Sequence, residues 1–162
     1  MKTLIALTLA GALTLSAIAA ATSISSTQAK EKKPMELGSF TLCLLVKDIK
    51  ASKEFYEKLG FKQTRGSLEQ NWVVLMNGTT TIGLFHGMFE KNMLTFNPGW
   101  DWKKEPLKDF QDVREIQRAL KASGLTLLTE ADEAKDGPAF FTLADPDGNP
   151  ILVDQHEPKP KR

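Results

Sequence analysis

Few side chains in this chain could do chemistry, and the pair with the most suggestive spacing lies near the C-terminus. Asp154 interrupts the apolar run that starts at Ile151, and His156 follows it two positions later. Side chains two apart in a strand point to the same face, so Leu152 and these two residues share one face. A carboxylate and an imidazole there could hold a metal ion or transfer a proton, although a structural hydrogen bond or ion pair explains Asp154 at least as well.

The remaining candidates have simpler interpretations. Cys43 is the only cysteine, so no intramolecular disulfide can form, and no neighbouring base or cation indicates a thiolate. We interpret it as a small apolar side chain that lines a cavity or packs in the core. His86 follows a predicted strand and is expected at the strand end or surface. The sequence has no phosphate-binding glycine loop, nucleophile elbow or CxxC motif, so those enzyme classes have no support.

In the first half, the hydrophobic pattern predicts a strand, a helix and three further strands. Asp48 stands where the cap of a helix over 49–59 would be, with Phe55 and Leu59 on its buried face and Gly60 after its end. The strands are predicted at 40–46, from 61, at 71–76 and at 79–85, the last two joined by an Asn-Gly hairpin turn.

The second half predicts the same order of elements. Asp112 and Glu115 form a capping box for a helix that runs to Ser123, and Gly124 follows it. Strands are predicted from 93 to 96, 125 to 129, 140 to 143 and 151 to 155. Cap and terminal glycine recur 64 residues after those of the first half, which indicates an internal duplication of a βαβββ unit.

The N-terminus has the pattern of a secretory leader. A basic start at Lys2 precedes an uncharged Ala/Leu/Thr-rich run and a stretch of small residues, with cleavage expected after Ala21 or Ala29. The run is weakly apolar for a membrane anchor, so we expect a signal peptide at 1–29, a periplasmic or secreted protein and no membrane association after its removal. With 21 basic against 20 acidic residues, no basic surface for nucleic acid is expected.

Two stretches together resemble the glyoxalase/bleomycin resistance/dioxygenase family, also called the vicinal oxygen chelate (VOC) family. They are Leu45-Val-Lys-Asp-Ile-Lys-Ala-Ser-Lys-Glu-Phe-Tyr-Glu-Lys-Leu-Gly-Phe61 and Asp145-Pro-Asp-Gly-Asn-Pro-Ile-Leu152. The resemblance implies an α+β fold in which two βαβββ modules form one domain with a sheet curled into a cup, and it implies a homodimer. We place the domain at 37–157, with modules at about 37–88 and 92–157 and a tail at 158–162.

The resemblance also implies where catalytic members would hold a divalent metal. Counting from the two motifs, the four positions carry Thr41, Gly83, Met93 and Leu152. These residues offer at best one weak donor, and a shift by one residue would move each side chain to the other face of its strand. We therefore expect no metal and no other cofactor, with a displaced site around Asp154 and His156 as the alternative.

The first functional hypothesis is an exported binding protein for a small-molecule ligand. Its cup is expected to be lined by Thr41, Cys43, Phe85, Met93, Trp100, Leu152 and Asp154. Strand parity also places Leu45 on the cup side, and Trp72, on a predicted strand, is expected in the core. The second hypothesis is a family enzyme of lyase, transferase or dioxygenase type, either metal-independent or with the displaced site. A third is an interaction protein, because Trp100 and Trp102 lie on an irregular loop that either covers the cup or packs at a dimer interface.

Overall fold

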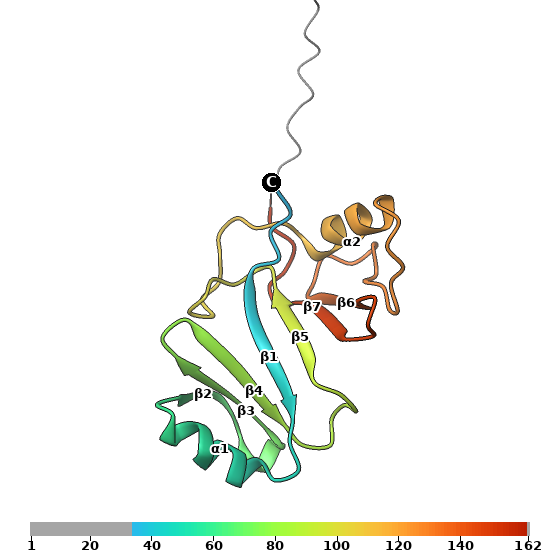
Figure 1. The fold of residues 1–162 in the computed structure, drawn as a ribbon. Coiled ribbons are helices and arrows are strands. Elements are labelled where there is room, and N and C mark those ends of the chain that lie inside the picture. The colour runs from blue at the N-terminus through green and yellow to red at the C-terminus, as the bar shows by residue number, and fades with distance from the viewer. Residues whose placement is uncertain (1–33, 162) are drawn as a thin grey trace, which may run out of the picture. The chain divides into compact units, whose positions relative to one another are not determined.

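The centre of the fold is an antiparallel pair of strands, β1 (Ser39–Leu45) and β5 (Met93–Asn97), in register from Ser39 opposite Asn97 to Cys43 opposite Met93. This pair joins the two halves of the chain in the computed structural model, which describes residues 34–161 (Figure 1). The seven strands of this part form one open sheet in the order β2-β3-β4-β1-β5-β7-β6. The other strands are β2 (Lys62–Ser67), β3 (Trp72–Asn77), β4 (Thr80–Phe85), β6 (Ala139–Ala144) and β7 (Pro150–Gln155).

The two helices begin and end with the same devices, which confirms the predicted repeat at these positions. The Asp48 carboxylate accepts the Ala51 N–H at the start of α1 (Ile49–Lys58), and Asp112 accepts the Arg114 N–H at the start of α2 (Val113–Ala122). Gly60 and Gly124 follow the two helices with φ of 87° and 89°, a conformation that favours glycine. A short 3-10 turn, η1 (Leu68–Gln70), precedes β3.

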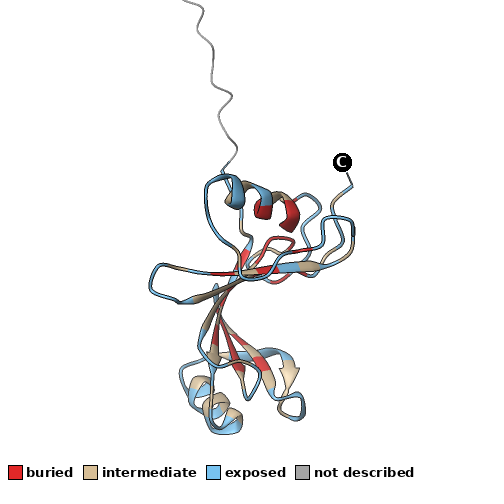
Figure 2. Cartoon of the chain, turned by 90° about the vertical axis from the view of Figure 1, so that its right-hand side faces the viewer, coloured by how far each residue is buried: buried red, intermediate tan, exposed pale blue. Residues whose placement is uncertain are grey.

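Both helices pack on the same face of the sheet. Tyr56 of α1 packs on a core of β3 and β4 residues that includes Leu75 and Leu84, and Ile116 of α2 packs on a core that includes Phe141 and Val153. Strand parity places these core residues on one side and Thr41, Cys43 and their neighbours on the other. In Figure 2 the buried residues lie along the strands and on α2, whereas α1 has none.

The predicted burial of Phe55 and Leu59 was wrong. Their side chains are 58% and 56% exposed, and the helix contacts its core through Ile49 and Tyr56 instead. These two residues are seven apart, which is close to two helical turns, so they lie on one face. Phe55 stacks edge-on against Tyr56 with ring centroids 5.3 Å apart, on the solvent side of the contact.

The predicted strand at 125–129 was also wrong as a full strand. Within this segment only Thr129 forms a β-bridge, to Thr142 of β6, and the Leu128 N–H also donates to the Thr142 carbonyl at 2.7 Å. The chain then turns toward α2, where the Ala131 N–H donates to Gln117 Oε1 at 2.7 Å and the Gln117 amide donates back to the Ala131 carbonyl. The second module is therefore a βαββ unit with one bridge where the first module has β2.

A buried polar network anchors the start of α2. Arg114 and Asp112 have side chains that are each 1% exposed, and the Arg114 guanidinium contacts an Asp112 oxygen at 3.3 Å. Gln155 of β7 donates to the other side of this network, from its Nε2 to Asp112 Oδ2 at 3.0 Å. The guanidinium also donates to the carbonyls of Asp132 and Gly137. Every buried side-chain nitrogen and oxygen in the described residues has a partner.

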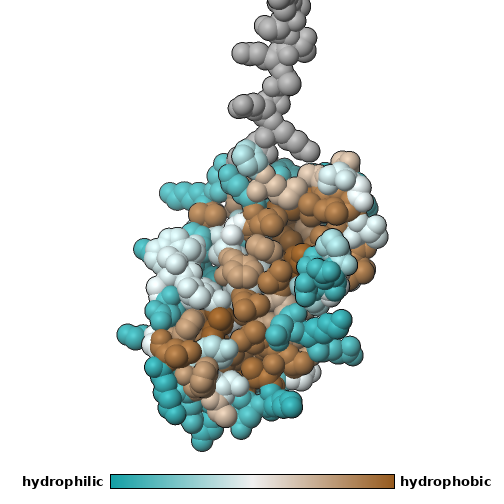
Figure 3. All heavy atoms as spheres, viewed as in Figure 1, coloured by the Kyte–Doolittle hydropathy of each residue, from teal (hydrophilic) through white to brown (hydrophobic). Residues whose placement is uncertain are grey.

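Apolar side chains also reach the surface, and Figure 3 shows them gathered in a band across one face. Half-exposed examples in the described residues are Phe40, Trp102 and Phe140. Within residues 34–161, the two helices are both too short and too polar to cross a membrane. The predicted leader at 1–29 lies outside the described residues.

Candidate functional site

The face of the sheet opposite the helices encloses a hollow of about 600 Å³, which we call the cup. Strands of both modules line it, because β1 and β5 place their odd-numbered residues on this face. The loop at 98–107 and the residues after β7 complete its wall. The lining residues are Thr41, Cys43, Arg65, Trp72, Val74, Phe85, Met88, Phe89, Met93, Thr95, Asn97, Trp100, Lys104, Leu152, Asp154 and His156.

The two ends of the cup differ in polarity. Cys43 and Met93 pair at one end of β1 and β5, close to the rings of Phe85, Phe89 and Trp72. We call this the apolar end. Ser39 and Asn97 pair at the opposite end of the same two strands, where the polar and charged lining residues gather. This polar end includes Thr41, Arg65, Asn97, Trp100, Lys104, Asp154 and His156.

Stacked planar groups form part of the polar end. The Trp100 ring lies parallel to the His156 ring at a centroid separation of 4.4 Å, and the Arg65 guanidinium lies 4.4 Å from the Trp100 ring centroid. The indole N–H donates to Glu157 Oε1 at 2.8 Å. Arg65 belongs to β2 in the first module and Trp100 to the second, so this contact joins the two modules across the cup.

Asp154 and His156 form the pair that their spacing suggests. His156 Nε2 lies 3.1 Å from Asp154 Oδ2, and both side chains are partly exposed on the cup side. Asn97 fixes the same stretch of β7, because its amide donates to the Asp154 carbonyl at 2.9 Å. The pair is therefore held at the polar end, where it could accept a hydrogen bond or a proton from a bound molecule.

Lys104 and Cys43 are the buried titratable groups of the cup. Lys104 Nζ donates to Thr41 Oγ1 at 2.7 Å, and its burial lowers the pKa of Lys104 to about 8. Burial raises the pKa of the Cys43 thiol, which lies 3.3 Å from Thr95 Oγ1. A thiol held in the protonated form is a poor nucleophile, so Cys43 contributes shape and a weak hydrogen bond rather than covalent chemistry.

The structure brings all seven predicted lining residues together around the cup, along with His156. That they bind a ligand stays a prediction. Two placements were wrong: Trp72 lines the cup and stacks on Phe85 instead of lying in the core, and Leu45 lies outside the cup. Leu45 comes after the last β1–β5 pair, and its N–H bonds the Asn92 side chain at the strand end.

Sequence reasoning missed Arg65 and Lys104. Arg65 is on a polar edge strand whose pattern gives no indication of which face is buried, and a register shift lies between Gln63 and Arg65. Lys104 is on an irregular loop, with a φ of 67° that lets its side chain reach back over β1. Neither position has a periodic signal, and no local motif indicates a lysine buried on a loop.

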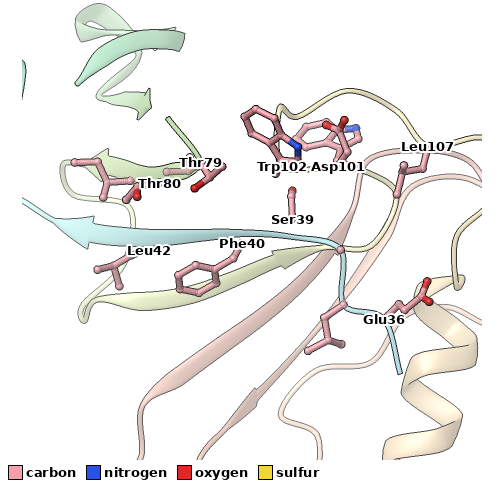
Figure 4. A pocket seen from close by; sticks show the side chains of 14 residues that line it. Glu36, Ser39, Phe40, Leu42, Thr79, Thr80, Asp101, Trp102 and Leu107 are labelled. Carbon is pink, nitrogen blue, oxygen red and sulfur yellow. The ribbon is translucent and has the colours of Figure 1, made fainter. Parts of the chain in front are cut away.

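A second, larger hollow of about 830 Å³ lies near the start of β1 (Figure 4). In this view Ser39 points toward Trp102, whereas Phe40 and Leu42 point to the other side of the strand. Trp102 therefore contributes to this hollow and not to the cup. The Asp101 carboxylate at its edge accepts the N–H groups of Lys103 and Glu105. The cup is the stronger candidate site because four charged or titratable side chains converge at its polar end.

The donor set of the cup does not fit the divalent metal that the resemblance implies. A side chain at Gly83 would have its Cβ 2.6 Å from the Phe85 ring, so a ligand there would require that ring to move, and Thr41 already binds the Lys104 ammonium. In residues 34–161 no three His, Cys, Asp or Glu side chains are placed to share a metal ion. The chemistry of these residues therefore offers a divalent metal too few ligands.

We expect zinc, nickel or manganese to leave the melting temperature of the protein unchanged. A metal that binds the folded state raises the melting temperature, and the rise grows with the logarithm of its concentration once this exceeds the dissociation constant. Differential scanning fluorimetry with each metal and with chelator measures this directly. Stoichiometric metal in the purified protein, lost when Asp154 or His156 is replaced by Ala, would instead establish a displaced site.

Comparisons with known proteins agree with the fold. Among solved structures, the chain is similar to a protein from Legionella pneumophila described as an NAD-dependent benzaldehyde dehydrogenase, at 18% identity and a TM-score of 0.54, covering 73% of this chain and 99% of that one. A glyoxalase/bleomycin resistance protein/dioxygenase superfamily member from Vibrio splendidus 12B01 has 18% identity and a TM-score of 0.50, covering 72% and 97%. At these identities the likeness shows the fold alone.

A search of curated proteins found no match. The family comparison is more informative, since residues 37–153 match the family described as Glyoxalase/Bleomycin resistance protein/Dioxygenase superfamily. This range contains both modules and the whole sheet up to Val153. The chain therefore belongs to the glyoxalase/bleomycin resistance protein/dioxygenase superfamily.

Proposed function

We propose that this protein binds a small amphipathic molecule in the cup, without a metal. The observation that carries the proposal is the division of one hollow of about 600 Å³ into an aromatic end and a charged end. Ligand sites are commonly of this volume and combine apolar walls with a few converging polar groups. A ligand would place its apolar body against Phe85, Phe89 and Met93 and its polar group near Thr41 and Asp154.

Membership of the superfamily supports ligand binding, since its members commonly bind small molecules. Its members also often form dimers. We also propose that this chain forms a homodimer, which sedimentation equilibrium would test. Export is a further proposal, based on the leader pattern at 1–29. Intact Met1 at the N-terminus of the purified native protein would refute it.

The binding proposal can be tested with N-phenyl-1-naphthylamine, a neutral aromatic probe that fluoresces in apolar sites. We expect it to bind the wild-type protein and to bind Val74→Trp at least tenfold more weakly. Val74 is a partly buried cup residue, and an indole there would occupy space that the probe needs. Fluorescence titration gives both dissociation constants, and circular dichroism checks that the variant is folded.

The matched control is Leu128→Trp, which adds the same side chain at a position that is 69% exposed and outside the cup. It should bind the probe like the wild type. Equal binding by Val74→Trp and wild type would place the probe on an exposed apolar surface and would contradict a ligand site in the cup.

A second candidate function is metal-independent proton transfer by the Asp154–His156 pair. The favouring observation is the 3.1 Å contact between His156 Nε2 and Asp154 Oδ2, since a carboxylate can hold an imidazole in a fixed orientation for proton transfer. Incubation with small carbonyl compounds in D₂O, followed by NMR, would detect exchange of acidic C–H protons. Exchange that is unchanged in His156→Gln would exclude this role.

A further inference from the structure

Lys104 is a buried cation, and none of the ion pairs formed among residues 34–161 includes it. The residue is 4% exposed, although lysine is rarely buried unless it is paired with an acidic group. Its ammonium donates to Ser39 Oγ at 3.1 Å, to the Phe40 carbonyl at 3.1 Å and to Thr41 Oγ1 at 2.7 Å. All three acceptors are uncharged, so hydrogen bonds compensate the lost hydration while the charge itself remains unbalanced.

The loop conformation that places Lys104 is itself held in position. Its backbone has a φ of 67°, which is uncommon for a residue with a side chain. The Lys104 N–H donates to the Asp101 carbonyl, and the Arg65 guanidinium donates to the Lys104 carbonyl at 2.9 Å. A strained backbone and a buried charge at one residue are unfavourable for stability, and such features persist most often where function needs them.

The neighbours of Lys104 make this end of the cup attractive to an anion. Thr41 accepts its hydrogen bond from the ammonium, so its own hydroxyl proton remains available to a ligand oxygen in the cup. Arg65 adds a second positive charge to the cup lining, and the one hydrogen bond of its guanidinium among residues 34–161 is to the Lys104 carbonyl. One carboxylate, Asp154, lies at the same end and contacts His156 Nε2 at 3.1 Å, so the two cations Lys104 and Arg65 outnumber it among the cup-lining residues.

We propose that Lys104 is the fixed cation of the cup and that, with Arg65 and Thr41, it selects ligands with an anionic oxygen head group such as a carboxylate or sulfonate. The head group would lie against Thr41 at the polar end, and the apolar body would extend toward Phe85. The lysine thereby supplies the positive charge at a position where the donor set does not fit a metal. This inference rests on the proposed function, because it names the class of ligand that the cup would bind.

The test compares two probes with one skeleton. N-phenyl-1-naphthylamine is neutral, and 8-anilino-1-naphthalenesulfonate carries the same rings with a sulfonate. We expect Lys104→Met to weaken sulfonate binding about tenfold or more, as loss of a charge-assisted interaction implies, and to leave the neutral probe within about twofold. Lys103→Met is the control, because this neighbour is exposed, lies outside the cup and contacts Trp102. It should change neither affinity.

A measurement on the unaltered protein covers the case in which Lys104→Met does not fold. The sulfonate stays ionised at all pH values used, so its affinity should fall by up to about tenfold per unit above pH 8 as Lys104 loses its proton, while the neutral probe should keep its affinity. This inference would be overturned if the affinity for the sulfonate changed neither with Lys104→Met nor with pH. If the neutral probe also binds Val74→Trp normally, the cup proposal fails as a whole.

Discussion

Replacing Asp112 with Ala is expected to lower the free energy of unfolding by about 3–5 kcal/mol, whereas the equivalent change Asp48→Ala should cost about 1 kcal/mol. Both residues cap a helix, 64 positions apart in the two modules. They differ in surroundings, since Asp48 is exposed and Asp112 is 1% exposed. The comparison therefore separates the value of a helix cap from the cost of an unpaired buried charge.

Asp112→Ala is expected to cost more because it removes the partner of buried polar groups that stay in place. Without its carboxylate, the Arg114 guanidinium keeps only backbone carbonyls as hydrogen-bond partners, and the Gln155 amide loses one of its two acceptors, at 3.0 Å. Urea denaturation monitored by circular dichroism gives both free energies. The double variant Asp112→Ala/Arg114→Met should recover part of the loss, because it removes the uncompensated charge. Equal costs for the two single variants would contradict the role given to the buried pair.

The helix ends could be predicted from sequence because their signals are local. An aspartate before each helix and a glycine after it define four backbone positions, and each is occupied as expected. The cup face could also be predicted, since period-two alternation assigns the faces of β1, β5 and β7 once the strands are known. These rules need only neighbouring residues.

The failures came from interactions between distant segments. The Phe55–Leu59 spacing correctly indicates a helix, but the position of β3 and β4 determines which of its faces is buried, and that face carries Tyr56. The segment predicted as a strand at 125–129 is followed at once by Ala131, whose backbone hydrogen-bonds to Gln117 of α2 instead of to a neighbouring strand. Lys104 reaches its partners on β1 over more than 60 residues of sequence. No pattern among neighbouring residues indicates contacts between segments this far apart in the sequence.

The pH dependence of stability should show two opposing contributions from the cup. The pKa of Lys104 is lowered by burial to about 8 from an ordinary value of 10.5, so between these pH values the unfolded chain binds more protons and stability rises with pH. The pKa of Cys43 is raised above 9.0, mainly by burial, so from about pH 9 upward the folded state retains a proton and stability falls. In the wild-type protein the two trends partly cancel.

Single substitutions should separate the two contributions. The difference in unfolding free energy between wild type and Lys104→Met should grow by about 1–3 kcal/mol from pH 7.5 to 10.5 in favour of the wild type, since one pKa unit corresponds to about 1.4 kcal/mol. The difference between wild type and Cys43→Ala should change in the opposite direction above pH 9. Urea titrations at intervals of half a pH unit measure both. If the difference in unfolding free energy between wild type and Lys104→Met did not change with pH, the Lys104 ammonium would be as well solvated in the folded protein as in the unfolded chain. That result would contradict the desolvated cation described at the polar end of the cup.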